Sequence, residues 1–106
     1  MPELDAPIAA MIDATNREDS TAFLASFSDD AVINDWGREF HGKTEIATWN
    51  TNENIGVNSR IEALDATRSG DETTVTISVS GNGYNGGGSM VFTTRSGRIE
   101  RMVIRG

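Results

Sequence analysis

The residue with the clearest chemical potential is Asp35, a carboxylate at the end of a short apolar strand predicted for residues 31–35. Burying a charge without a partner is costly, so a carboxylate on such a strand should be either hydrogen-bonded or functional. Trp36 follows directly, and a turn comes next. Two interpretations of Asp35 therefore stay open: a group that does chemistry, or a cap that holds the turn at Trp36-Gly37 through a backbone hydrogen bond.

The only histidine, His41, lies a few residues further along the chain. It could act as a base or orient a substrate, or it could be a histidine at a strand end that bonds to the backbone. If the turn has two residues, Gly37-Arg38, then Asn34 pairs with His41. The side-chain period of two in strands then places His41 on the opposite face from Asp35, and a one-residue change in the turn reverses this. A metal site is not expected, because there is no second histidine and no cysteine.

Helices are predicted in the first half of the chain. In the first of them, apolar side chains recur at helical spacing and Pro7 suits the first turn. Asp19 or Ser20 can cap the second, and a polar stop follows it at residues 29–30. The expected helices are residues 5–16, residues 19 or 20 to 27, and residues 43–49, with a loop over residues 50–56.

Strands dominate the rest of the chain. Residues 73–80 alternate almost strictly between apolar and polar side chains, with Val75, Ile77 and Val79 on one face. The glycine-rich residues 81–88 lack the spacing, the lysine and the following helix of a phosphate loop, so a flexible hairpin tip is expected there. Tight turns are expected at residues 69–71 and 96–97, and strands at residues 31–35, 38–41, 57–68, 73–80, 89–95 and 99–105.

This order of elements predicts a single α+β domain over residues 1–106. Three N-terminal helices with a hairpin precede four long antiparallel strands, and the helices are expected to cover one face of a curved sheet. A long twisted sheet that wraps around helices forms a cone with an open end, and such mouths are common small-molecule sites.

Composition excludes several classes of partner. The formal net charge of −7 argues against nucleic acid and against an anionic membrane surface, because both are bound by clustered lysine and arginine. No window approaches the run of apolar residues that a membrane span needs, and the first residues lack the pattern of a signal peptide. A cytoplasmic location is therefore expected, and without cysteine there are no disulfides.

Several motifs resemble the nuclear transport factor 2-like superfamily, which includes SnoaL-like polyketide cyclases and ketosteroid isomerases and has a cystatin-like, cone-shaped fold. The sharpest likeness is F-S-D-D-A-V-I-N-D-W-G at residues 27–37, followed by H-G-K-T-E-I at residues 41–46 and then an aromatic residue. The closing S-G-R-I-E-R-M-V-I at residues 96–104 is similar to the last hairpin of the family. The resemblance implies the fold for nearly the whole chain, but that fold hosts enzymes, binding modules and transport adaptors.

By this resemblance, Asp35 occupies the position at which ketosteroid isomerases place the aspartate that moves a proton between substrate carbons. Those enzymes stabilise the intermediate with a tyrosine on the first helix and a protonated acid on a later strand. The corresponding positions here hold Met11, which cannot donate a hydrogen bond, and Ser89, which donates only weakly. Because the loss of such donors slows a reaction by orders of magnitude, steroid isomerisation by that mechanism is not expected.

The predicted site is a pocket for a small apolar ligand between the helices and the concave face of the sheet, with no cofactor and no metal. Asp35 and His41 are its candidate catalytic residues, and Trp36 and Tyr84 are expected near the mouth. The other residues expected to contact a ligand are Met11, Phe23, Phe27, Ile33, Trp49, Ser89, Phe92 and Met102.

Two functions remain open. A SnoaL-like enzyme would use Asp35 as a general acid/base on a small apolar carbonyl compound, in an isomerisation, a cyclisation or a hydrolysis. The alternative is a non-catalytic module that holds an apolar ligand or a protein partner. The stripe of Val75, Ile77 and Val79 is expected on the sheet face opposite the pocket, where a monomer would expose part of it, so a homodimer through that face is predicted.

Overall fold

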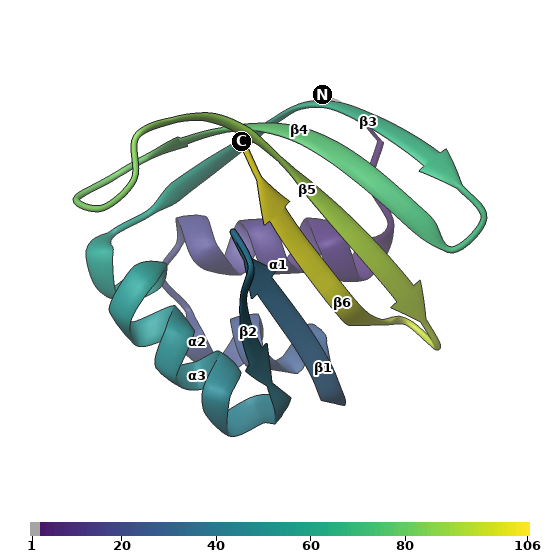
Figure 1. Ribbon diagram of the computed structural model, residues 1–106, viewed down its shortest axis with the longest axis horizontal. Helices are drawn as coiled ribbons and strands as arrows, with labels where there is room; N and C mark the ends of the chain where they lie inside the picture. Colours follow the sequence, from purple (N-terminus) through teal and green to yellow (C-terminus); the bar gives the residue numbers. More distant parts are fainter. Residues whose placement is uncertain (1–2) are drawn as a thin grey trace.

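The computed structural model describes residues 3–106, which form three helices packed against one curved six-stranded sheet (Figure 1). None of the helices in this part of the chain is both long and apolar enough to cross a membrane. The elements, in chain order, are α1 (Ala6–Asn16), α2 (Ser20–Ala25), β1 (Phe27–Asp35), β2 (Arg38–His41), α3 (Gly42–Glu53), the 3-10 turn η1 (Ile55–Val57), β3 (Arg60–Ser69), β4 (Glu72–Ser80), β5 (Gly86–Arg95) and β6 (Arg98–Arg105).

The strand order in the sheet is β2-β1-β6-β5-β4-β3, so the hairpin near the N-terminus joins the last strand of the chain. Neighbouring strands are antiparallel except β1 and β6, which run parallel. The predicted α+β fold with a curved sheet around helices is confirmed, but the sheet is mixed and open rather than wholly antiparallel. No short turn joins β1 to β6, so nothing local forces these two strands to run in opposite directions.

Helix starts follow the local signals, and α1 ends at Asn16 as expected, whereas the ends of α2 and α3 differ from the prediction. Pro7 lies in the first turn of α1, and the Asp19 side chain caps α2 by accepting from the Ala22 N–H at 3.0 Å. α2 ends at Ala25, so the expectation that it runs through Phe27 was wrong. The acidic residues 29–30 lie within β1, where the register shifts, and they do not stop the chain there.

The third helix is longer than its sequence indicates. Residues 50–53 were expected to lie in a loop, but α3 continues to Glu53 and η1 follows it. Asn50 and Asn54 are both buried, and the Asn54 amide N–H donates to Asn50 Oδ1 at 3.0 Å. This buried polar pair supports a segment that propensity alone would leave in a loop.

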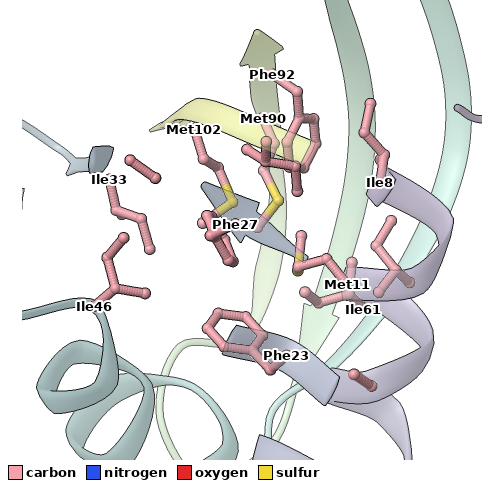
Figure 2. Close-up of a cluster of buried hydrophobic side chains, with 14 of the residues drawn as sticks. Ile8, Met11, Phe23, Phe27, Ile33, Ile46, Ile61, Met90, Phe92 and Met102 are labelled. Carbon is pink, nitrogen blue, oxygen red and sulfur yellow. The ribbon is translucent and has the colours of Figure 1, made fainter. Parts of the chain in front are cut away.

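The core lies between the helices and the concave face of the sheet. Figure 2 shows Met11 of α1, Phe23 of α2 and Ile46 of α3 directed toward Ile33 and Met102 of the sheet. All five side chains are completely buried. Burial of such side chains is the main favourable contribution to folding.

The stripe on β4 faces this core. Val75 and Ile77 are buried and Val79 is half-buried, whereas Thr74 and Thr76, on the other face, are exposed. The expected placement of the stripe on the outer face was therefore wrong, because the alternation shows which residues share a face but not which face the helices cover. The homodimer loses that support and stays a prediction, which the molecular mass in solution would test.

Thr73 lies on the same face of β4 as Val75 and is buried. Its Oγ1 is the one sealed side-chain oxygen or nitrogen, within residues 3–106, that has no hydrogen-bond partner. Thr73→Val keeps the shape and removes that hydroxyl, so we expect the free energy of unfolding to rise by about 1 kcal/mol. Urea unfolding measures the change, and Thr74→Val, on the exposed face, serves as the control with an expected effect within about 0.5 kcal/mol. A lower stability of Thr73→Val than of the native chain would contradict the prediction.

Candidate functional site

A cavity of about 310 Å³ lies between α3, the glycine-rich β4–β5 connection and the concave face of the sheet. That volume is at the lower end of the range for small-molecule sites. In Figure 1 the β4–β5 connection extends on the same side of the molecule as the end of α3, and the Asn82 N–H donates to the Val57 carbonyl at 2.8 Å. The apolar part of the wall consists of Val57, Ile61, Ile77, Val79, Met90 and Ile104.

Asp35 forms part of the wall at the end of β1, and only 9% of its surface is exposed. One carboxylate oxygen, Oδ2, accepts from Trp49 Nε1 at 3.0 Å and from Arg38 Nη2 at 2.7 Å. No donor within residues 3–106 is hydrogen-bonded to the other oxygen, Oδ1. The carboxylate is therefore held through one oxygen, while the second can interact with a molecule in the cavity.

Arg38 connects Asp35 to a second acid in the wall, Glu53. Its Nη1 donates to Glu53 Oε2 at 2.9 Å, and its Nη2 is also within hydrogen-bond distance of Glu53 Oε1. The hydrogen bonds that Arg38 donates to Glu53 raise the pKa of the Arg38 guanidinium above its ordinary value, and the negative charges of Glu53 and Asp35 add to this effect. The guanidinium lies 5.6 Å from the centre of the Phe40 ring. These contacts keep a positive charge beside the two carboxylates.

The turn that follows Asp35 is held by another side chain. Its two residues are Trp36 and Gly37, both with positive φ, so Asp35 pairs with Arg38 across the hairpin. The expected turn at Gly37-Arg38 was one residue too late. Asn34 Oδ1 accepts from the Gly37 N–H at 2.8 Å, so Asn34 stabilises this turn, and Asp35 does not cap it.

Two exposed aromatic side chains flank the cavity. Trp36 is 63% exposed and Tyr84 is 54% exposed, and both contribute to its wall. The Tyr84 hydroxyl donates to the Gly87 carbonyl at 2.7 Å, which folds the ring back onto the glycine-rich segment. Large apolar side chains exposed together commonly mark a binding region.

His41 lies on the other face of the sheet. It pairs with Val32, whereas Asn34 pairs with Glu39, so the expected pairing of Asn34 with His41 was wrong. His41 Nε2 lies 3.1 Å from Glu39 Oε1, and this hydrogen bond, together with Arg101, lowers the pKa of Glu39. His41 does not line the cavity, and its face is opposite that of Asp35.

The structure divides the predicted contact residues into three groups. Asp35, Trp36, Trp49 and Tyr84 come together around the cavity. Ser89 points to the outer face of β5, since its neighbours Gly88 and Met90 line the cavity. The others are completely buried in the core and do not reach the cavity: Met11, Phe23, Phe27, Ile33, Phe92 and Met102.

Five polar residues of the wall were not anticipated: Arg38, Glu53, Asn54, Ser59 and Arg105. The hairpin itself could have indicated Arg38. In a hairpin with a two-residue turn, the residue after the turn lies opposite the residue before it, which here is Asp35. Glu53, Asn54 and Ser59 lie in a polar segment that was expected to be a loop or a strand start, and Arg105 is the last residue of β6. No cluster of three histidine, cysteine or acidic side chains that could hold a metal ion is found in the described part of the chain.

Comparison with known proteins places the chain in a family. Residues 8–102 match the family model of the SnoaL-like domain, and no curated protein matches the chain. A "putative polyketide cyclase" from Sinorhizobium meliloti, known from a crystal structure, is 30% identical in sequence. The match covers 96% of this chain and 95% of that chain, with a TM-score of 0.89.

Two more distant structures share the fold. A protein from Catenulispora acidiphila with a ketosteroid isomerase-like fold, in complex with trimethylamine, is 18% identical, with 98% of this chain and 87% of that chain covered and a TM-score of 0.86. A Mycobacterium tuberculosis protein in complex with estradiol-17beta-hemisuccinate is 16% identical, with coverages of 96% and 93% and a TM-score of 0.83. The resemblance to the nuclear transport factor 2-like superfamily is thus confirmed, and the chain belongs to the SnoaL-like domain family.

Proposed function

We propose that the cavity binds a small, mainly apolar carbonyl compound and that Asp35 acts on it as a general base. The observation that carries this proposal is the asymmetric environment of the carboxylate. Oδ2 is held by Trp49 and Arg38, while Oδ1 has no donor within residues 3–106 and Asp35 forms part of the cavity wall. A base that is oriented by neighbours and keeps one lone pair available meets the geometric requirement for proton abstraction.

The proposed step balances without a cofactor. Asp35 Oδ1 takes a proton from the carbon next to the substrate carbonyl. The electron pair of that C–H bond forms the carbon–carbon double bond of an enolate, and the carbonyl π pair moves onto oxygen. In a β,γ-unsaturated substrate the enolate is conjugated with that double bond, and return of the proton to the γ carbon completes an isomerisation. If the enolate carbon instead attacks a second carbonyl of the same molecule, the proton passes to the new alkoxide and a cyclisation results.

The family relationship supports this substrate class. The Sinorhizobium protein is described as a "putative polyketide cyclase", and polyketides are carbonyl compounds, while the Mycobacterium protein was crystallised with a steroid ester. The two positions that hold the donors in ketosteroid isomerases do not line the cavity here, since Met11 is in the core and Ser89 is on the outer face. The reaction is therefore distinct from the isomerisation of steroids by that pair of donors.

Deuterium exchange at a model ketone tests the proposal. 2-Tetralone has acidic hydrogens next to an apolar bicyclic carbonyl, and their exchange in D₂O is followed by proton NMR. We expect the protein to accelerate the exchange at least about tenfold over buffer, since a positioned base contributes at least that much. Calorimetry on the same compound measures its binding. If 2-tetralone does not bind, the cavity is not a site for such molecules.

A second function, binding without catalysis, is favoured by one observation. The charge of Asp35 is already paired with that of Arg38, which also pairs with Glu53, so the carboxylate has a structural role without a reaction. In that case 2-tetralone binds, and its exchange in the presence of the protein stays at the rate in buffer. The cytoplasmic location stays a prediction under either function.

A further inference from the structure

Two polar side chains in the cavity wall, Asn54 and Ser59, have groups with no hydrogen-bond partner within residues 3–106. Asn54 is 3% exposed and Ser59 is 5% exposed, and both line the cavity. They are joined through the backbone, because the Ser59 N–H donates to the Asn54 carbonyl at 3.1 Å. They lie at the end of α3 and the start of β3, apart from the β1–β2 hairpin that carries Asp35.

The orientation of the Asn54 amide is determined by its neighbours. Its Nδ2 donates to Asn50 Oδ1 at 3.0 Å and to Thr15 Oγ1 at 3.2 Å. Thr15 uses its own hydroxyl hydrogen on the Met11 carbonyl at 3.0 Å, so it can only accept from Asn54. Both amide hydrogens are therefore used inside the protein, and the amide oxygen Oδ1 points away from these partners.

Neither Asn54 Oδ1 nor Ser59 Oγ is hydrogen-bonded within residues 3–106, neither atom is sealed from solvent, and both residues line the cavity. The only sealed and unpaired side-chain polar atom in that part of the chain is Thr73 Oγ1. A buried polar group is normally paired, and each exception calls for an explanation. An acceptor and a hydroxyl that share a cavity wall form a complementary pair for a ligand group that both donates and accepts.

We infer that Asn54 and Ser59 form a subsite for a hydroxyl group of the ligand. The ligand hydroxyl donates its hydrogen to Asn54 Oδ1, and its oxygen accepts from the Ser59 hydroxyl. The subsite rests on the proposed function, because it assumes that the cavity binds an apolar ligand. The subsite also specifies the class of ligand. The ligand would be a hydroxylated carbonyl compound, with its hydroxyl at Asn54 and Ser59 and its acidic C–H at Asp35.

The test compares 2-naphthol with naphthalene, which have one bicyclic skeleton and differ by a single hydroxyl. Calorimetric titration of the native chain is expected to show about tenfold tighter binding of 2-naphthol, because a site that bonds a hydroxyl discriminates against an analogue without it. Ser59→Ala is expected to weaken 2-naphthol binding about fivefold and to change naphthalene binding by less than about twofold. Its thermal unfolding should match that of the native chain, since the hydroxyl has no hydrogen-bond partner among the described residues.

Two further variants keep the outcomes separate. Ser69→Ala, at the far end of β3, is the matched control, and it is expected to retain the preference for 2-naphthol. If Asp35→Asn removes the preference and Ser59→Ala keeps it, the hydroxyl binds at Asp35 and the inferred subsite is wrong. Equal binding of both compounds to the native chain also overturns the subsite but leaves the cavity as a ligand site. If neither compound binds, the proposed function fails together with the subsite.

Discussion

Asp35→Asn is expected to lower the protein-dependent exchange rate of 2-tetralone by about 10²- to 10⁴-fold, the usual contribution of a positioned general base. Asparagine has nearly the same shape, and its amide oxygen can still accept from Trp49 Nε1, which lies 3.0 Å from Oδ2 in the native chain. It has no lone pair basic enough to take the proton. Binding of 2-tetralone should therefore persist while the exchange is lost.

Proton NMR in D₂O measures this rate, and calorimetry confirms that the variant still binds the ketone. Asp30→Asn is the matched control, because Asp30 is an exposed acid on the same strand that does not line the cavity. An exchange rate of Asp35→Asn equal to that of the native chain would show that Asp35 is not the base. The cavity would then be left with a binding role.

Phe23→Ala is expected to lower the free energy of unfolding by about 3–5 kcal/mol, as truncations of large buried aromatic side chains do. Phe23 is 0% exposed, and its ring centre lies 5.1 Å from that of Phe27 and 6.1 Å from that of Trp49. Truncation leaves a void among these rings that the surrounding core fills only in part. Because small domains are stable by only about 5–15 kcal/mol, this loss is a large fraction of the total.

Urea unfolding measures the loss, with Tyr84→Ala as the control for removal of an aromatic ring that is largely exposed. The prediction is wrong if the two substitutions have equal effects. Phe23 also helps to position the site. Trp49 stacks on its ring and donates its indole N–H to Asp35. Phe23→Leu, which refills most of the void, should restore stability in large part and keep Trp49 in place.

The fold could be predicted from the sequence because its local signals are strong and consistent. The Asp19 cap, the Ser96-Gly97 turn and the alternation of β4 each depend on neighbours in the chain, and each is found in the structure. Helix ends were less certain. Residues 50–53 are polar and typical of a loop, yet they are helical because Asn50 and Asn54 form hydrogen bonds within the folded protein.

The candidate site was predictable only in part, because its residues come together through the packing of distant segments. Burial of Asp35 follows from its place at the end of an apolar strand, but its partners Trp49 and Arg38 are defined by the packing of α3 against the hairpin. Asn54 and Ser59 look like surface residues in the sequence, since asparagine and serine are mostly exposed in proteins. Their burial depends on the cavity wall around them.

The sequence by itself determined which residues share a face of each strand, where most turns lie, and that one carboxylate ends an apolar strand. Those properties depend on backbone geometry and on nearest neighbours. Only the tertiary structure decided which face of the sheet the helices cover, which apolar residues fill the core instead of lining the cavity, and which oxygen of Asp35 stays available. These features depend on how distant segments pack. Each helix or strand buries its apolar face against another element, and the whole fold determines which element that is.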